Sequence, residues 1–371
     1  MTGPRNIVLV AGARPNFMKV APLLHELRKH PEVFKTSLIH TGQHYDMAMS
    51  DVFFHDLGLP LPDRSLGVGS GSHAEQTAGV MTTFERVCLE ERPELVVVVG
   101  DVNSTMACAI TAKKLCIPVA HVEAGLRSRD WTMPEEINRV ITDAISDLLF
   151  TPSRDANENL LREGISAERI HFVGNVMIDC LFDQLPKTEN RATLERFGVA
   201  AGGYTTLTLH RPSNVDDPTV FRGIVDVLIE LSRELPIIWP VHPRSRKMLE
   251  ALGLVQRVAS SRGLRLTGPM GYLDMLTLNR RARMIITDSG GLQEEATVLG
   301  VPCITLRQNT ERPVTVEAGA NRVVGNHAAA IRAAVSSVLH ENVGKIRVPE
   351  FWDGKAAVRI VDVFMRLYSR A

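Results

Sequence analysis

The sequence predicts an α/β protein built from two doubly wound domains in succession, and three observations support this. Short β-branched runs alternate with longer amphipathic segments along most of the 371 residues, which is the pattern of βαβ units. Several runs are apolar throughout, as expected for strands of a parallel sheet covered by helices on both faces. The alternation lapses once, around residues 184–204, and then begins again.

The first half contains six short runs that read as strands. They are Asn6–Val10, Thr36–His40, Leu95–Val99, Pro118–Val122, Leu148–Phe150 and Ile170–Val173. Amphipathic segments between them predict helices. The clearest are Met18–Arg28, Glu75–Glu91 and Ser104–Leu115.

The polar stretch "QLPKTENRATLERFGVAAGGY" predicts a linker region with one short helix. Six further strands follow it: Thr205–Leu209, Pro236–Trp239, Leu264–Thr267, Met284–Thr287, Pro302–Leu306 and Arg322–Val324. We therefore expect domains at residues 1–183 and 184–355. The last helix, Ala356–Leu367, has an apolar stripe, and we expect residues 356–371 to pack back on the first domain.

Charge and cysteine usage limit the class of partner. The 42 basic residues balance the 42 acidic ones, so no bulk field draws the protein to nucleic acid or membranes, and local groups must hold any anionic ligand. The N-terminus has neither a membrane span nor a secretory layout. Five scattered cysteines without zinc spacing indicate reduced thiols in a cytoplasmic protein.

Polar residues collect directly after the predicted strands. In doubly wound sheets, ligands bind outside the carboxyl ends of the strands, so these residues are the candidates for a ligand site. They are Arg14, Lys19, Gln43, His44, Asp101, Glu123, His210, Arg211, His242, Asp288, Ser289, Arg307 and Arg312.

Two of these strand ends suit an anion. "AGARPNFMK" places a glycine turn before a helix, although an ordinary loop with surface basic residues explains it equally well. "TDSGGLQEEA" is more specific, because Gly290 and Gly291 let the backbone approach a bulky anion and Ser289 suits an N-cap. Glu295 can accept from ribose hydroxyls; the alternative is a capped helix with a solvated acidic first turn. Neither stretch has a GxGxxG or Walker pattern.

The stretch "HVEAGLRSRDWTMPEEINR", together with Asp101 and His210, indicates an acid/base set. Carboxylates crowded in a cleft raise one another's proton affinity, and nearby arginines keep others ionised. A salt-bridge network at a domain edge is the alternative explanation. The histidines follow different strands, so we expect no metal site. A GxSxG serine elbow is also absent from the sequence.

These motifs occur in one order across almost the whole chain. They are "GARPNFMK", "TGQHYDM", "GDVNST", "HVEAGLRS", "MPEEINR", "GNVMID", "HRPSNVD", "PVHPR", "TDSGGLQEEA" and "TERP". As an ordered set they resemble the non-hydrolysing UDP-N-acetylglucosamine 2-epimerases. The resemblance implies two Rossmann-like domains facing across a cleft, the GT-B architecture, with the second domain binding UDP. It implies no cofactor, and a UDP-sugar as the partner.

The resemblance also implies roles for individual residues. Asp101, Glu123, Glu135 and His210 match the acid/base group of the family. Ser289, Gly290 and Gly291 match the diphosphate loop, with Arg14 and Arg312 as further anionic contacts, Glu295 at the ribose, and Met270 and Met275 at the uracil. Lys19, Gln43, His44, Arg139 and His242 match positions facing the diphosphate, the sugar or the cleft.

The reaction implied is removal of the C2 proton with departure of UDP from C1, followed by re-addition of UDP and reprotonation at the other face. "HRPSNVDD" resembles relatives acting on modified sugars such as UDP-2,3-diacetamido uronic acids, so that substrate stays open. Asp46 and Gly67–Ser72 replace the residues of an activator site found in some members. We therefore expect that site to be absent or altered.

Three alternatives remain beside epimerisation: a UDP-sugar glycosyltransferase of the same architecture, a hydrolysing epimerase, and a non-catalytic nucleotide-sugar-binding protein. A transferase does not need several carboxylates facing C2, so the acidic set favours the epimerase. By analogy with similar enzymes, we expect a homodimer and a product for surface polysaccharide.

Overall fold

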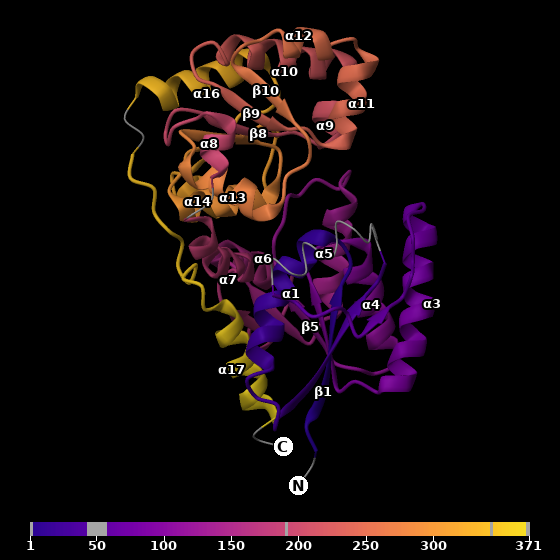
Figure 1. The fold of residues 1–371 in the computed structure, drawn as a ribbon. Helices are drawn as coiled ribbons and strands as arrows, with labels where there is room; N and C mark the ends of the chain where they lie inside the picture. Colours follow the sequence, from indigo (N-terminus) through magenta and orange to yellow (C-terminus); the bar gives the residue numbers. More distant parts are fainter. Residues whose placement is uncertain (1–2, 43–57, 190–191, 342–343, 369–371) are drawn as a thin grey trace. The chain divides into compact units, whose positions relative to one another are not determined.

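The computed structural model describes residues 3–42, 58–189, 192–341 and 344–368. The chain forms two compact units, each with its own sheet. The first comprises Met1–Asp183 with Glu350–Ala371, and the second comprises Gln184–Pro349 (Figure 1). Both units are α/β with parallel strands, as the sequence predicts.

The sheet of the first unit has seven described strands in the order β3-β2-β1-β4-β5-β6-β7. All described pairs are parallel. The strand order reverses between β1 and β4, which is the topological switch point where doubly wound sheets bind ligands. The strands are β1 (Arg5–Ala11), β2 (Phe34–His40), β3 (Arg64–Ser65), β4 (Leu95–Val99), β5 (Val119–Val122), β6 (Leu148–Thr151) and β7 (Ile170–Phe172).

Helices cover this sheet, and Figure 1 shows α1 and α17 on one side of it and α3 and α4 on the other. The predicted helix from Met18 begins four residues earlier, at Arg14, because a proline in the first turn is compatible with a helix start. The described helices are α1 (Arg14–Leu27), α3 (His73–Glu91), α4 (Asn103–Lys114), α5 (Pro134–Ile145), α6 (Arg154–Arg162), α7 (Val176–Gln184), α17 (Ala356–Tyr368) and the short η1 (Ala167–Arg169).

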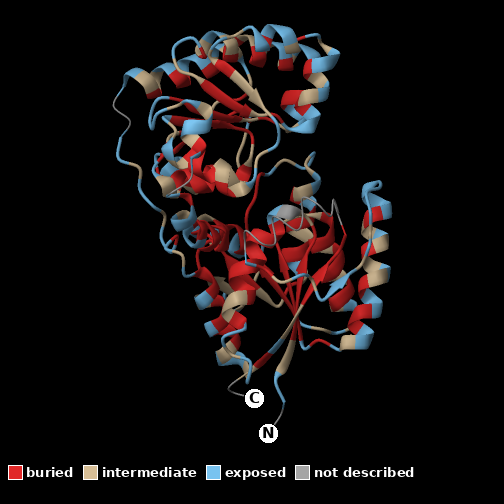
Figure 2. Ribbon diagram, in the orientation of Figure 1, coloured by how far each residue is buried: buried red, intermediate tan, exposed pale blue. Residues whose placement is uncertain are grey.

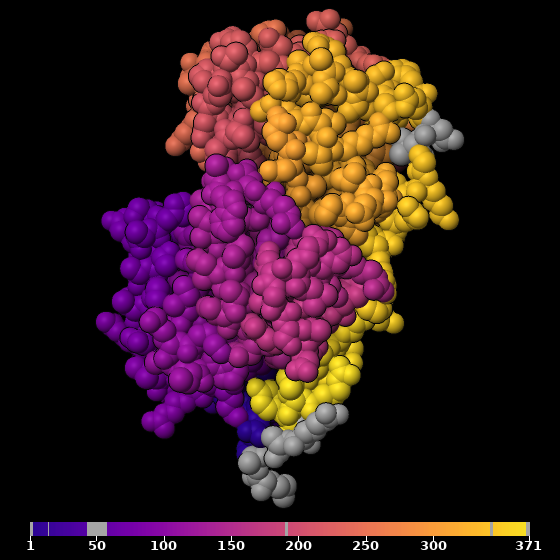
Figure 3. Space-filling model, turned by 180° about the vertical axis from the view of Figure 1, so that it is seen from behind, coloured from indigo at the N-terminus to yellow at the C-terminus, as the bar shows by residue number. Residues whose placement is uncertain are grey.

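The C-terminal segment belongs to the first unit. The Asp179 carboxylate accepts from the first two backbone amides of α17, at 3.1 and 2.7 Å, and Phe364 packs edge-on against Phe150. Figure 3 shows this yellow segment on the outside of the unit. Residues 350–355, which the sequence assigned to the second domain, also group here, because the Trp352 indole donates to the Pro152 carbonyl at 2.9 Å.

The sheet of the second unit has six described strands in the order β10-β9-β8-β11-β12-β13, again parallel, with its switch point between β8 and β11. The strands are β8 (Thr205–Thr208), β9 (Ile237–Pro240), β10 (Leu264–Thr267), β11 (Met284–Thr287), β12 (Cys303–Thr305) and β13 (Asn321–Val323). The helices are η2 (Leu185–Thr188), α8 (Thr193–Phe197), α9 (Pro212–Val215), α10 (Pro218–Leu231), α11 (Pro243–Ala251), α12 (Val255–Ala259), α13 (Tyr272–Arg281), α14 (Gly290–Leu299), α15 (Pro313–Glu317) and α16 (Ala328–His340).

Both sheets are buried, and Figure 2 shows their strands in red beneath helices whose outer faces are exposed. All five residues of β4, from Leu95 to Val99, are at most 1% exposed. The hydrophobic effect therefore holds each sheet between its helices and fixes where the strand ends lie. In the described ranges, no helix is long and apolar enough to cross a membrane.

Candidate functional site

Glu123, directly after β5, and Lys19 of α1 form a buried ion pair. Glu123 is 5% exposed and Lys19 is 7% exposed, and their charged groups are in direct contact. Glu123 has φ 73°, a left-handed conformation that costs free energy for a residue with a side chain. Its amide donates to the Phe150 carbonyl at 3.0 Å, which holds this turn against β6.

Asp101 follows β4 and pairs with Arg139 of α5 at 2.5 Å. Arg139 is 2% exposed and also donates to Glu136 at 2.7 and 3.0 Å. Burial works to raise the pKa of Glu136, but the Ser128 amide and Arg139 outweigh it and hold that pKa below its usual value. Glu136 thus fixes Arg139, and Arg139 fixes the carboxylate of Asp101.

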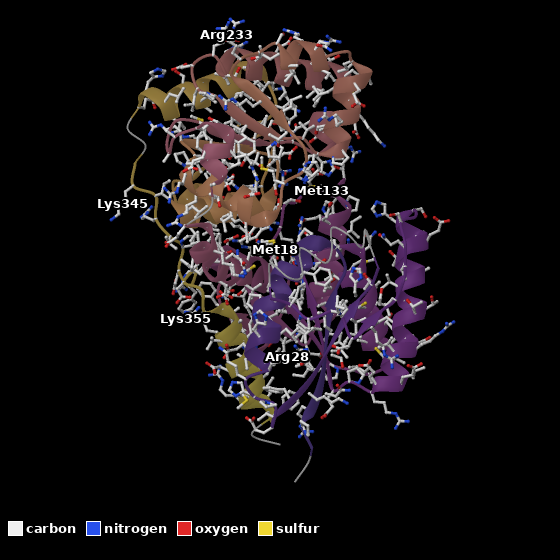
Figure 4. All side chains as sticks on the ribbon, viewed as in Figure 1. Met18, Arg28, Met133, Arg233, Lys345 and Lys355 are labelled. Carbon is white, nitrogen blue, oxygen red and sulfur yellow. The ribbon has the colours of Figure 1, made fainter. Side chains whose placement is uncertain are left out.

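Glu135 lies in the first turn of α5, half-buried, one residue before Glu136. Met133, labelled in Figure 4, is the N-cap residue of this helix and marks the end that carries Glu135. The four-residue spacing places Arg139 on the same helical face as Glu135. The first unit thus brings Asp101 and Arg139 into contact, as it does Glu123 and Lys19.

The turn after β1 packs tightly. A Cβ on Gly12 would lie 1.9 Å from Ser104 Oγ of α4 and 3.3 Å from Thr41 Oγ1, so a larger residue there would displace the Ser104 side chain. Arg14 begins α1 just beyond this turn. Gln43 and His44, which the sequence also nominates, lie outside the described residues.

In the second unit, His210 and Asp288 join the ends of β8 and β11 across the switch point. His210 Nδ1 lies 2.8 Å from Asp288 Oδ1, and Asp288 also accepts from the amides of His210 and Arg211, both at 2.9 Å. Burial works to raise the pKa of Asp288, but His210 and these amides hold it below its usual value. The His210 side chain is 36% exposed while that of Asp288 is 0% exposed, so a buried carboxylate orients a partly exposed ring.

His242 lies beside this pair, with its ring centroid 5.6 Å from that of His210. Its Nδ1 accepts from the Arg244 amide at 3.2 Å as the N-cap of α11. Burial, and then the nearby His210, lower the pKa of His242. The ring therefore stays neutral near pH 7, with its proton on Nε2.

The start of α14 faces a buried arginine. A Cβ on Gly290 would lie 2.5 Å from Arg312 Nη1 and 2.7 Å from Glu311 Oε1, so the glycine allows a close approach. Arg312 is 6% exposed, pairs with Glu294 at 2.7 Å and contacts Glu311. Ser289 is the N-cap residue, as predicted, but its side chain makes no capping hydrogen bond. A helix N-terminus with a guanidinium beside it can bind an anion, although Arg312 is here paired with two carboxylates.

Glu295 is buried one turn further into α14, at 4% exposed, so a solvated acidic turn does not describe this helix. Burial raises the pKa of Glu295 to about 7. The Tyr272 hydroxyl donates to it at 3.1 Å. Met270 and Met275, both half-buried, lie on either side of Tyr272 in the chain, and Met270 packs against a small apolar cluster with Tyr204 and Leu278.

Sequence reasoning missed several residues of this arrangement. Tyr272 reaches Glu295, and its place between two nominated methionines was the available signal. Glu136 and Asp143 of α5 are buried acceptors that no local pattern distinguishes from surface carboxylates. Among the described residues, no group of three or more histidine, cysteine or carboxylate side chains is placed to hold a metal ion.

The two doubly wound parallel sheets, each with charged groups at its switch point, place the chain in the Rossmann-like α/β class of proteins. The family model described as UDP-N-acetylglucosamine 2-epimerase matches residues 25–365. The chain belongs to the UDP-N-acetylglucosamine 2-epimerase family.

Known relatives resemble the chain over nearly its full length. The UDP-N-acetylglucosamine 2-epimerase of Methanocaldococcus jannaschii is 43% identical, covering 96% of this chain and 97% of the relative. The UDP-2,3-diacetamido-2,3-dideoxy-D-glucuronate 2-epimerase of Pseudomonas aeruginosa is 40% identical, covering 97% and 99%. A crystal structure of the M. jannaschii UDP-GlcNAc 2-epimerase, in complex with UDP-GlcNAc and UDP, matches with a TM-score of 0.90 and 43% identity, covering 97% and 99%.

Proposed function

We propose that this protein is a non-hydrolysing UDP-N-acetylglucosamine 2-epimerase, an isomerase that inverts C2 of a UDP-2-acetamido sugar. Removal of the C2 proton and departure of UDP from C1 leave a 2-acetamidoglucal. UDP then adds back to C1 while a proton arrives at C2 from the opposite face. The observation that carries the proposal is the buried Glu123 carboxylate, held against Lys19 in a left-handed turn at the end of β5.

The second unit holds the nucleotide in this proposal. The amides at the start of α14, from Ser289 to Gly291, and the Arg312 guanidinium stabilise the diphosphate both when bound to the sugar and as the leaving group. Glu295 accepts from the ribose hydroxyls, and Met270 and Met275 contact the uracil. The remaining ligand contacts are assigned to Arg14, Lys19, Gln43, His44, Arg139 and His242.

The acid/base chemistry is assigned to Asp101, Glu123, Glu135 and His210. Epimerisation needs one group that removes the C2 proton and another that delivers a proton to the other face. The Glu123 carboxylate is buried against the Lys19 ammonium group, and we assign it the role of the base. His210 is oriented by the buried carboxylate of Asp288, and we assign it to proton transfer with the sugar.

Solvent isotope exchange tests the reaction directly. The protein is incubated with UDP-sugar in deuterated water without any acceptor, and the substrate pool is analysed by NMR. Deuterium at C2 of both epimers supports the proposal. Glu123→Gln should abolish exchange and leave UDP affinity unchanged, whereas Glu158→Gln, which removes an exposed carboxylate paired with Arg162, should exchange normally.

Three outcomes of that experiment would favour a different function. Absence of deuterium across several UDP-N-acetyl sugars, with sugar transfer once an acceptor is added, would favour a glycosyltransferase. Exchange accompanied by one free UDP for each epimerised sugar would identify a hydrolysing epimerase. Binding of UDP with neither exchange nor transfer would leave only a binding protein.

The sugar itself has two candidates, because relatives of similar identity carry both names: UDP-N-acetylglucosamine at 43% and a UDP-2,3-diacetamido uronic acid at 40%. We assign UDP-N-acetylglucosamine, with the product serving surface polysaccharide. The exchange assay with both sugars, compared by kcat/KM, decides between them.

We also propose a cytoplasmic homodimer. The five cysteines are free, which fits a reducing compartment. An apolar groove on the first unit is lined by Met81 of α3, Met106 of α4 and the 41%-exposed Ile137 of α5, and a second copy of the chain would cover it. Light scattering should give twice the mass of one chain for the wild type and the mass of one chain for Ile137→Asp. Cell fractionation tests the cytoplasmic location.

A further inference from the structure

The His121 ring is buried in the first unit and bonded on both sides. It is 0% exposed and sits at the third position of β5. Its Nδ1 lies 2.6 Å from Asp143 Oδ1 and its Nε2 lies 2.8 Å from the Gly100 carbonyl. A carbonyl oxygen can only accept, so Nε2 donates to it, and Nδ1 is the ring nitrogen that lies against the carboxylate.

Asp143 connects this ring to two further segments. It lies on α5, is 1% exposed, and accepts from the Gly125 amide at 3.0 Å and from Arg127 at 2.7 Å. Burial works to raise the pKa of Asp143, but His121 and Arg127 outweigh it and hold that pKa below its usual value. Asp143 is therefore an anion that binds β5, the turn after β5 and α5 together.

Each segment held in this way carries one of the acid/base candidates. Gly100, with φ 70°, immediately precedes Asp101, and Gly125, with φ 81°, follows Glu123 by two residues. Asp143 lies eight residues after Glu135 on α5, so the two share one side of the helix. The His121–Asp143 pair thus connects the Asp101 turn, the Glu123 turn and the helix of Glu135.

We propose that the His121–Asp143 pair is the positioning device that sets these three carboxylates against one another for catalysis. This inference rests on the proposed epimerase function. Neither residue is assigned a contact with substrate. Its effect is geometric: a shift of a strand-end turn by a fraction of an ångström moves the carboxylate that the turn carries, and proton transfer is steep in distance.

Two substitutions separate the two hydrogen bonds of the ring. His121→Asn places an amide nitrogen near the Nδ1 position, so it keeps the bond to Asp143 and releases the Gly100 carbonyl. His121→Gln places its nitrogen near the Nε2 position, so it keeps the Gly100 bond and releases Asp143. His171→Asn is the matched control, since that half-buried histidine lies in β7 of the same sheet, where its ring packs on Phe150.

The readouts are kcat, KM, UDP affinity, melting temperature and C2 deuterium exchange. We expect each His121 variant to lower kcat and exchange by roughly ten- to a hundredfold, with KM and UDP affinity within about twofold of the wild type at temperatures where the protein is folded. His171→Asn should lower the melting temperature only. If both His121 variants fold and keep the wild-type kcat, the inference is overturned. It is also overturned if their loss of kcat is no larger than that of His171→Asn when the melting temperatures fall equally. If the wild-type protein itself shows no C2 exchange, the proposed function fails instead.

Discussion

His210 Nδ1 lies 2.8 Å from Asp288 Oδ1, and this pair spans the switch point of the second sheet. The carboxylate is fully buried and the ring is 36% exposed. A buried carboxylate at Nδ1 fixes the orientation of the imidazole ring. This hydrogen-bonded geometry supports the choice of His210 as the acid/base candidate of the second unit.

Replacing Asp288 with Asn should uncouple His210. The amide is neutral and has one acceptor oxygen, so its nitrogen must face either His210 Nδ1 or the two backbone amides from which Asp288 now accepts. We expect kcat to fall by about two to four orders of magnitude, measured by C2 deuterium exchange. Asp216→Asn, which removes an exposed carboxylate paired with Arg244, should retain wild-type turnover. A folded Asp288→Asn protein with normal kcat would remove this pair from the mechanism.

Gly290→Ala tests the anion site at α14. The added methyl group would lie 2.5 Å from Arg312 Nη1, and the guanidinium is pinned by Glu294 and Glu311, so it must shift away from the helix start. We expect UDP affinity to fall by about tenfold or more, which corresponds to loss of a charge-assisted hydrogen bond. Calorimetry measures this directly.

The control for that substitution is Gly223→Ala in the middle of α10, where nothing lies within 4 Å of an added Cβ. It should leave UDP affinity unchanged and raise the free energy of unfolding by about 0.5–1 kcal/mol. Equal UDP affinity in both variants would contradict the assignment of the diphosphate to this helix.

Glu295 should give UDP binding a pH signature. Its pKa of about 7 means that the carboxyl is mostly protonated at pH 6, and hydroxyl donors from a ribose favour the ionised form. UDP binding at pH 6 should therefore release a proton, and this release should fade by pH 8. Calorimetry in buffers of different ionisation enthalpy reports the number of protons released.

Glu295→Gln should abolish that proton release and weaken UDP binding by roughly ten- to a hundredfold. Glu317→Gln, on the exposed side of α15, should change neither the proton release nor the UDP affinity.

The raised pKa of Glu295 also makes the stability of the protein depend on pH. A carboxyl whose pKa is raised on folding destabilises the unliganded protein as pH rises from the ordinary value of 4.5 through 7. Glu295→Gln should therefore raise the melting temperature more at pH 8 than at pH 5.

Rate curves test the expectation of an absent or altered activator site. Asp46 lies outside the described residues. Gly67–Ser72 is the segment that leads into α3, and it contains only glycine, serine and Val68. We expect hyperbolic dependence of rate on UDP-N-acetylglucosamine. A clearly sigmoidal curve, abolished by a second UDP-sugar that is not a substrate, would show that activation survives.

Several features followed from the sequence alone because their causes are local. The run Leu95–Val99 is apolar and β-branched, so it predicts a buried parallel strand, and the structure confirms it. The start of α14 after Ser289 was predictable from the local Ser-Gly-Gly sequence, although the Ser289 side chain makes no capping hydrogen bond. The division into two sheets followed from the single lapse in alternation. The small strand β3, of two residues, carried no periodic signal.

The tertiary structure alone decided which charges are buried and what they touch. His121 and Asp143 are 22 residues apart in sequence, and His210 and Asp288 are 78 residues apart; no pattern in the chain pairs them. Periodicity reports only which face of an element is apolar. Whether a carboxylate on that element is solvated or bonded to a distant ring depends on how the strands and helices pack. The sequence therefore showed which residue types belong to the site. Which of them pair with one another, and which pKa values are shifted, depends on the burial that tertiary packing imposes.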